Sequence, residues 1–325
     1  MPEMTLDDLQ RLLWEFARHR VVTVAARTGL LTRLAERPAT PDEAASELGL
    51  DRLATAKVVR ALAAIGIVTG DGNRFRVVET LAPWLAAGAD DITPFIAHSH
   101  AMYESWGESL EPWLRGEPWG VRPRDPETVR AFGSAMRAIG RRIAQRVAAV
   151  LDPEEARRML DLGGGFGQYS VALCTLHPGL HATVLDIPPV VDLARTELAG
   201  SELAARIDFV GGDYHTTEVG RGYDLTLLAN ILHQEPAPQA AALVRRAADA
   251  LTPGGRVAIV DFQIDDEQRR HPFGTLFAIN MRSFGDTHTE PNIRGWMQAA
   301  GLGAITRTDL DPDRWLIVGR KPGQP

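Results

Sequence analysis

Three glycines, Gly163, Gly165 and Gly167, in the stretch MLDLGGGFGQYS have the spacing that most clearly indicates a ligand-binding site. An apolar run at 159–162 precedes them, and an apolar run with helical spacing follows at 171–176. A strand, a glycine turn and a helix in this order form a ligand site at the carboxyl edge of a parallel sheet. Glycine is required there because the turn adopts unusual backbone angles and the main chain approaches the ligand closely.

The spacing of these glycines narrows the choice of ligand. It reads G-x-G-x-G, with Gln168 where a nicotinamide-dinucleotide fingerprint has its third glycine. No G-K-[ST] follows, which excludes a phosphate-binding P-loop. Asp161 inside the motif and Asp186 at the end of the next expected strand complete a pattern suited to a nucleoside with free ribose hydroxyls. The sequence therefore favours a nucleoside site over a nicotinamide-dependent oxidoreductase.

Further polar residues follow expected strands in the same half of the chain. They lie in the segments 186–189 (DIPP), 211–214 (GGDY) and 229–233 (ANILH), and at Asp261. Strands are expected at 159–162, 181–185, 207–210, 225–229, 256–260 and 314–318, with helices between them that include 237–250 and 290–300. This alternation predicts an α/β fold with a Rossmann-like, doubly wound and mainly parallel sheet whose crossovers are right-handed.

The N-terminal part has a different pattern. Apolar residues at helical spacing cover 5–35, a helix-turn-helix is expected at 40–65, and a hairpin with an Asp-Gly turn follows at 66–78. Together these elements predict a winged helix. Its second helix offers Arg52, Lys57 and Arg60 but is otherwise mainly Ala, Leu and Val, so it favours packing against a protein surface over binding DNA. The net charge of -7 also argues against a nucleic-acid binder, although a winged-helix regulator that senses a nucleoside is the alternative from that class.

Four motifs, LDLGGGFG, VLDIP, GGDY and LLANILH, occur in this order. With them the chain closely resembles S-adenosylmethionine-dependent methyltransferases, and more narrowly the small-molecule O-methyltransferase family with an N-terminal winged-helix dimerisation domain. The resemblance implies S-adenosyl-L-methionine as cofactor and a small-molecule acceptor from secondary metabolism. The cofactor-binding residues that it implies are Asp161, Gly163 and Gly165 along the methionine and ribose, Asp186 on the ribose hydroxyls, Asp213 and Tyr214 at the adenine, and Asn230.

The resemblance also implies a catalytic base, His233. An imidazole suits this task because its pKa of about 6.5 lets it accept a phenolic proton near neutrality. The family flanks this base with two glutamates: the first matches Asp261, and the second falls near Thr287 or His288, where no acid matches. A base with fewer carboxylate neighbours has less to orient it and to stabilise its charged form. We expect O-methylation with His233 as general base and Asp261 beside it.

A second mechanism stays open because His288 is expected to reach the same cleft. His233 and His288, with Gln234 or Asp261 beside them, could hold a divalent or ferric metal ion with positions open for a substrate. This arrangement resembles a branch of the same family that methylates the β-carbon of 2-oxo acids, where a metal stabilises the enolate. Phe277 matches an acceptor-pocket position of the family, and helical packing explains it equally well.

The chain is expected to divide into a winged-helix dimerisation domain at 1–90, a helical linker at 91–150 that contributes to the acceptor pocket, and a cofactor-binding domain at 151–325. A homodimer joined through the N-terminal domain is expected, because residues 5–35 are too apolar to stand alone. The single cysteine, Cys174, excludes an intramolecular disulfide and a cysteine-based zinc cluster. No apolar run reaches membrane-spanning length and the N-terminus has no signal pattern, so we expect a cytoplasmic protein without membrane or nucleic-acid partners.

Overall fold

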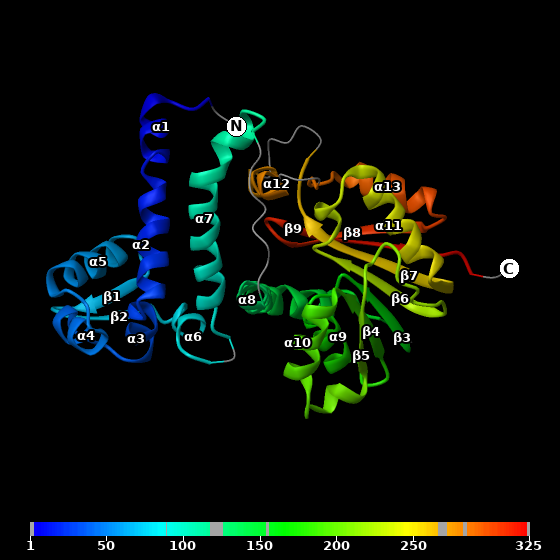
Figure 1. The fold of residues 1–325 in the computed structure, drawn as a ribbon, viewed down its shortest axis with the longest axis horizontal. Helices are drawn as coiled ribbons and strands as arrows, with labels where there is room; N and C mark the ends of the chain where they lie inside the picture. The colour runs from blue at the N-terminus through cyan, green and yellow to red at the C-terminus, as the bar shows by residue number, and fades with distance from the viewer. Residues whose placement is uncertain are drawn as a thin grey trace. The chain divides into compact units, whose positions relative to one another are not determined.

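The computed structural model describes residues 3–88, 90–117, 126–153, 156–265, 272–281 and 285–323, of which 126–131 by their backbone alone. The chain forms two compact units: Met1–Arg124 with Ser134–Ile139, and Asp125–Gly133 with Gly140–Pro325. The first unit contains the N-terminal helices and the second contains the large sheet (Figure 1). The three-part division expected from the sequence is finer than this one and stays a prediction.

The first unit is helical, with one small hairpin. Its elements are α1 (Leu6–Leu12), α2 (Glu15–Arg27), α3 (Leu30–Glu36), α4 (Pro41–Leu48), α5 (Arg52–Ala64), β1 (Val68–Asp71), β2 (Arg74–Val77), α6 (Ala82–Leu85) and α7 (Thr93–Leu114). The expected helix-turn-helix is confirmed in α4 and α5, and the expected hairpin in the antiparallel pair β1 and β2. The boundary between the units falls within α8 (Pro126–Val150).

Local sequence explains where α4 begins and ends. The Oγ1 atom of Thr40 accepts the N–H of Glu43 at 3.1 Å, and Oε2 of Glu43 accepts the N–H of Thr40 at 2.9 Å, which is a capping box. Pro41 occupies the first turn, where its missing N–H costs no hydrogen bond. Gly49 ends the helix in the left-handed region, with φ of 67°.

The second unit is built on a seven-stranded sheet in the order β5-β4-β3-β6-β7-β9-β8. The strands are β3 (Arg158–Leu162), β4 (His181–Asp186), β5 (Ile207–Gly211), β6 (Tyr223–Ala229), β7 (Leu251–Phe262), β8 (Gly303–Asp311) and β9 (Arg314–Arg320). Strands β3 to β7 pair in parallel, whereas β9 runs antiparallel to both β7 and β8. The expected doubly wound, mainly parallel sheet is therefore confirmed.

The edge strand β8 is the one strand of this sheet that the sequence analysis missed. Most of its side chains are exposed, and only Leu310 is buried. A strand that lacks alternating apolar residues gives no pattern for sequence reasoning to detect.

Helices cover both faces of the sheet (Figure 1). The C-terminal half of α8, α9 (Gln168–Leu176) and α10 (Pro188–Leu198) pack on one face, and α11 (Ala237–Asp249) and α13 (Glu290–Ala299) on the other. The unit also contains α12 (Pro272–Ala278) and the short 3-10 helices η1 (Glu202–Ala205), η2 (Leu232–Gln234) and η3 (Ile279–Met281). Side chains of a strand alternate between the faces, so Met159 joins the core beneath α9 and α10, whereas Leu160 and Leu162 join the core beneath α11 and α13. In the described part of the chain, no helix combines the length and apolar character needed to cross a membrane.

Candidate active site

The glycine turn after β3 requires glycine at several positions. Gly163, Gly165 and Gly167 have φ of 68°, 59° and 71°, in the left-handed region that other residues rarely adopt. A Cβ atom on Gly163 would also lie 2.7 Å from the side chain of Ile231. A side chain on Gly163 would therefore collide with Ile231, so the turn keeps this shape only with glycine at that position.

Asp186 ends β4 and faces this turn. Its Oδ2 atom accepts the N–H of Gly165 at 2.8 Å, and its Oδ1 atom accepts the N–H of Ile187 at 2.8 Å. Burial raises the pKa of this carboxyl, and the two backbone donors oppose that rise. Each oxygen retains capacity for a further hydrogen bond, as recognition of two ribose hydroxyls requires.

Asp161 lies beneath the turn and is fully buried. The Ser170 hydroxyl donates to its Oδ2 atom at 2.8 Å, while its Oδ1 atom has no partner among the described residues. A Cβ atom on Gly164 would lie 2.5 Å from its carboxyl carbon, so the carboxyl packs directly against the turn. Burial raises the pKa of Asp161 to about 7; the bond from Ser170 opposes this rise, and the nearby charge of Asp186 adds to it.

Asp213 and Tyr214 follow β5, in a loop that is tied to the segment after β6. Oδ1 of Asp213 accepts the N–H of His215 at 2.8 Å. The Tyr214 hydroxyl donates to Oε1 of Glu235 at 2.5 Å, and the same oxygen lies 3.0 Å from Nε2 of His215. Sequence reasoning placed Tyr214 near the adenine but missed this link to Glu235.

Asn230 occupies the end of β6 in the left-handed region, with φ of 54°, a conformation that asparagine tolerates better than most residues. Its Nδ2 atom donates to the hydroxyl oxygen of Tyr169 at 2.8 Å, and its backbone N–H donates to the carbonyl of Val260 at 2.8 Å. These bonds fix the backbone three residues before His233.

His233 and Asp261 come together at the carboxyl ends of two neighbouring parallel strands, β6 and β7. Nδ1 of His233 lies 2.7 Å from Oδ1 of Asp261, and the side chains are only 5% and 7% exposed. Asp261 also accepts the N–H of His233 at 3.2 Å and of Phe262 at 2.9 Å. Burial alone would raise the pKa of Asp261, but the imidazole and these hydrogen bonds outweigh burial and hold that pKa below its usual value. Asp261 is therefore a carboxylate that accepts the Nδ1 proton, which leaves Nε2 with its lone pair.

Aromatic rings surround this pair. The His233 ring lies 5.1 Å from the ring of Phe262 and meets Phe277 edge-on at 5.2 Å. Phe273 packs against Phe262 at 5.4 Å and against Phe277 at 6.0 Å. The sequence analysis named Phe277 only, although Phe262 directly follows Asp261 and that position was a usable signal.

His288 lies on the other side of the turn that carries His233. Its Nε2 atom is 3.1 Å from the carbonyl oxygen of Leu232 and 3.0 Å from that of Glu235. Its ring packs edge-on against Trp296 at 4.8 Å. A nitrogen between two carbonyl oxygens must carry a proton, so in this arrangement Nε2 is a hydrogen-bond donor and has no lone pair for a metal ion. Within the described ranges, no group of three or more His, Cys, Asp or Glu side chains could hold a metal ion.

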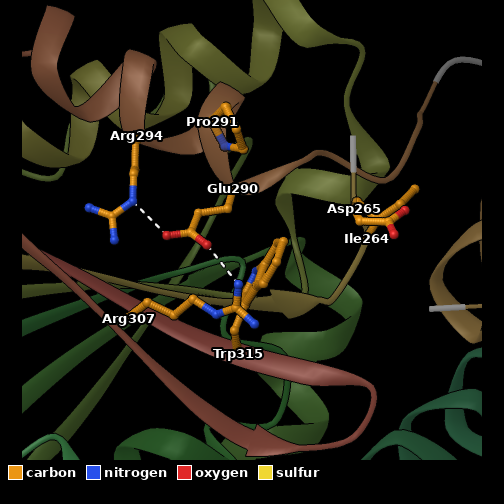
Figure 2. A pocket seen from close by; sticks show the side chains of 7 residues that line it. All are labelled: Ile264, Asp265, Glu290, Pro291, Arg294, Arg307 and Trp315. Atoms are coloured by element: carbon orange, nitrogen blue, oxygen red, sulfur yellow. Dashed lines mark hydrogen bonds and ion pairs between the residues drawn. The ribbon is translucent and has the colours of Figure 1, made fainter. Parts of the chain in front are cut away.

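A pocket of about 350 Å³ lies beyond the end of β7, in a region where sequence reasoning expected no site (Figure 2). It is lined by Ile264, Asp265, Glu290, Pro291, Arg294, Arg307 and Trp315. Glu290 bridges the two arginines, at 2.6 Å from Nε of Arg294 and 2.7 Å from a terminal nitrogen of Arg307. Arg307 also pairs with Asp309 at 2.7 Å, so both arginines of the lining are held in ion pairs within the protein.

Comparisons with known proteins agree with this geometry. A sequence model of the O-methyltransferase domain family matches residues 95–303. The 3-hydroxy-5-methyl-1-naphthoate 3-O-methyltransferase of Streptomyces sahachiroi is 28% identical over 92% of this chain and 89% of its own length. The tetracenomycin polyketide synthesis 8-O-methyl transferase of Streptomyces glaucescens is 28% identical over 97% of this chain and 96% of its own.

Solved structures share the fold. Human N-acetylserotonin methyltransferase, solved in complex with S-adenosylmethionine, superposes with a TM-score of 0.85 at 22% identity, over 99% of each chain. The glycine turn, the capacity of Asp186 for further hydrogen bonds and the Oδ1 atom of Asp161, which has no partner among the described residues, suit such a ligand, which carries ribose hydroxyls and positive charge. The chain therefore belongs to the O-methyltransferase domain family, and it is a methyltransferase that uses S-adenosylmethionine.

Proposed function

We propose that the acceptor is a small aromatic molecule of secondary metabolism and that the enzyme methylates one of its phenolic oxygens. The observation that carries this proposal is the buried pair of His233 and Asp261, joined at 2.7 Å and surrounded by phenylalanine rings. The names of the two Streptomyces relatives, which describe O-methylation of a naphthoate and of a polyketide, support an aromatic acceptor.

In the proposed mechanism His233 is the general base. Its Nε2 atom takes the phenolic proton, which makes the acceptor oxygen a stronger nucleophile, and Asp261 stabilises the resulting imidazolium. When bound, S-adenosylmethionine would supply the methyl group, carried on a sulfonium. Phe262 and Phe277 give the acceptor ring an apolar surface and keep water from the base.

The cofactor site that we propose uses the residues already placed at the carboxyl ends of β3, β4 and β5. Asp186 binds the ribose hydroxyls, and the backbone of Gly163 and Gly165 lies along the methionine and ribose. Asp161, beneath the turn, lies along the same part of the cofactor. Asp213 and Tyr214 form the adenine side of the site. Asn230 lines the cofactor site next to the catalytic base His233. Isothermal calorimetry of Asp186→Ala with S-adenosylmethionine tests this assignment: unchanged affinity would refute it.

The alternative of metal-assisted C-methylation needs His233 and His288 as ligands. The bond from Nε2 of His288 to two backbone carbonyls speaks for a different role of that side chain. Elemental analysis of the purified enzyme and turnover of a phenol after treatment with EDTA separate the two mechanisms. A stoichiometric metal that is lost with His288→Ala would favour the metal-assisted reaction.

We further propose that the chain acts as a homodimer joined through its N-terminal part, with 1–90 as the dimerisation domain, 91–150 as a linker that contributes to the acceptor pocket, and 151–325 as the catalytic domain. The support for a dimer is a set of large apolar side chains on and beside α1, each between 43% and 71% exposed: Leu6, Leu9, Leu12, Leu13, Trp14 and Phe16.

The experiment that tests the central proposal is methyl transfer to a panel of phenols and hydroxynaphthoates, followed by mass spectrometry. The wild-type enzyme should yield O-methyl ethers, and His233→Ala should lose about 10²–10⁴-fold in kcat with its affinity for S-adenosylmethionine retained. Products methylated on carbon, or full turnover without His233, would overturn the proposal.

A further inference from the structure

The proposed catalytic base, His233, lies in a very short element, the 3-10 turn η2. Turn η2 is closed by hydrogen bonds of 3.0 Å from the N–H of Gln234 to the carbonyl of Ile231 and from the N–H of Glu235 to the carbonyl of Leu232. A single 3-10 turn has poor hydrogen-bond geometry and little stability of its own. The orientation of the His233 ring therefore depends on what holds this turn from outside.

His288 provides such a hold. It precedes α13 and is far from η2 in sequence, yet its Nε2 atom reaches the carbonyl oxygens of Leu232 and Glu235, the two residues that bracket the turn. His288 is 7% exposed, and its two hydrogen bonds set the orientation of a ring that also packs edge-on against Trp296. The Nε2–H of His288, shared between the carbonyls of Leu232 and Glu235, thus connects both ends of the turn to one side chain.

The far end of the turn is also anchored through the Glu235 side chain, which binds the Tyr214 hydroxyl and lies 3.0 Å from Nε2 of His215. The turn is thus held between the loop after β5 and the segment before α13. Two contacts reach the turn backbone from opposite kinds of group: Asp261 accepts the N–H of His233 at 3.2 Å, and Nε2 of His288 reaches the carbonyl oxygens of Leu232 and Glu235.

We propose that His288 is a positioning residue for methyl transfer. Its Nε2–H binds the carbonyl oxygens at both ends of the η2 turn and so holds the His233 ring in line with Asp261. This inference rests on the proposed role of His233 as base. It gives His288 a function in the loop where the resemblance places the family's second acid, near Thr287 or His288. His288 binds the backbone of the η2 turn, whereas a carboxylate in its place would interact with the His233 imidazole itself.

The test compares two substitutions of His288, one that keeps a hydrogen-bond donor near the position of Nε2 and one that removes it. His288→Gln places an amide N–H₂ at the same number of bonds from Cα as Nε2, whereas His288→Leu keeps the bulk and removes the donor. We expect His288→Leu to lower kcat by about 10–100-fold with S-adenosylmethionine affinity nearly unchanged, because small misplacements of a reacting group cost this much. His288→Gln should recover most of the loss.

A second readout does not depend on turnover. The proton that Nδ1 of His233 shares with Asp261 is expected to give a far-downfield proton NMR signal. His288→Leu should shift or broaden that signal, and His288→Gln should restore it. If His233 proved dispensable for catalysis, the proposed function would fail, yet this signal would still report on the hold.

Trp296→Leu is the matched control, because it removes packing against His288 but keeps the Nε2 donor. If Trp296→Leu lowers kcat as much as His288→Leu at an equal loss of thermal stability, the role of His288 is packing and the proposal fails. Equal kcat and NMR spectra in His288→Leu and wild type would also overturn it. Should His288→Leu not fold, His288→Asn, whose amide is too short to reach the carbonyls, takes its place with the same expectations.

Discussion

The charge of Asp261 decides whether His233 is a base or an acid at Nε2. A carboxylate at 2.7 Å from Nδ1 keeps the proton on that nitrogen, whereas an amide N–H₂ would donate to Nδ1 and move the proton to Nε2. Asp261→Asn should therefore lower kcat by about 10²–10⁴-fold, with S-adenosylmethionine affinity unchanged. Single-turnover methyl transfer measures the effect. Asp309→Asn, which changes an exposed carboxylate of the same unit, should retain full activity.

Asp161 should make the stability of the unliganded enzyme depend on pH. Its pKa of about 7 in the folded protein is far above the ordinary aspartate value of 3.8, because burial disfavours the charge. Between these values the folded state binds a proton that the unfolded state has lost, so stability falls as the pH rises from about 4 to about 7 and then levels off. The charged form costs roughly 4 kcal/mol by this shift.

The comparison that isolates this contribution is wild type against Asp161→Asn, which is neutral at every pH. The stability of the variant relative to wild type should rise between pH 5 and pH 7.5, as measured by chemical unfolding in each buffer. If the two curves ran parallel across this range, Asp161 would not be the titrating group.

At the scale of elements, the glycine turn after β3 requires glycine for two reasons, a positive φ and a lack of space for a Cβ atom. A pair of variants can separate these two effects. Gly163 and Gly200 both have positive φ, at 68° and 79°, but a Cβ atom on Gly163 would lie 2.7 Å from Ile231, whereas one on Gly200 has nothing within 4 Å. Gly200→Ala should cost about 1 kcal/mol of stability from backbone strain alone and leave cofactor binding intact. Gly163→Ala should in addition displace the turn and lower S-adenosylmethionine affinity by about tenfold or more, measured by calorimetry.

Much of the sheet could be predicted because its strands are buried on both faces and therefore appear as short apolar runs, most of them followed by glycine or aspartate. The same logic predicted that Asp186 and His233 lie at one sheet edge. The exposed strand β8 carries no such pattern. The contact between His288 and the η2 carbonyls could not be predicted either, because it joins segments more than 50 residues apart through backbone atoms that every residue shares. Sequence motifs report side-chain chemistry and say little about which backbone groups need a partner.

At the scale of the whole molecule, the exposed apolar side chains on α1 and the start of α2 require an explanation. Helix α1 buries none of its residues, although Leu6, Leu9 and Leu12 all lie on it. Contiguous exposed apolar surface on a protein marks an interaction site. A second copy of the chain is the partner that we propose, since two such faces are self-complementary about a two-fold axis.

Substitution of Leu9 and Leu13 by glutamate should therefore convert a dimer into monomers. A charge buried in an apolar interface costs several kcal/mol, and each copy would contribute two. Light scattering at micromolar concentration measures the mass directly. Leu176→Glu is the matched control: Leu176 is 56% exposed on α9, outside the proposed dimerisation domain, so the variant should keep the dimer mass. A wild-type protein that scatters as a monomer would contradict the proposal, and a double variant that remains a dimer would place the interface elsewhere on the chain.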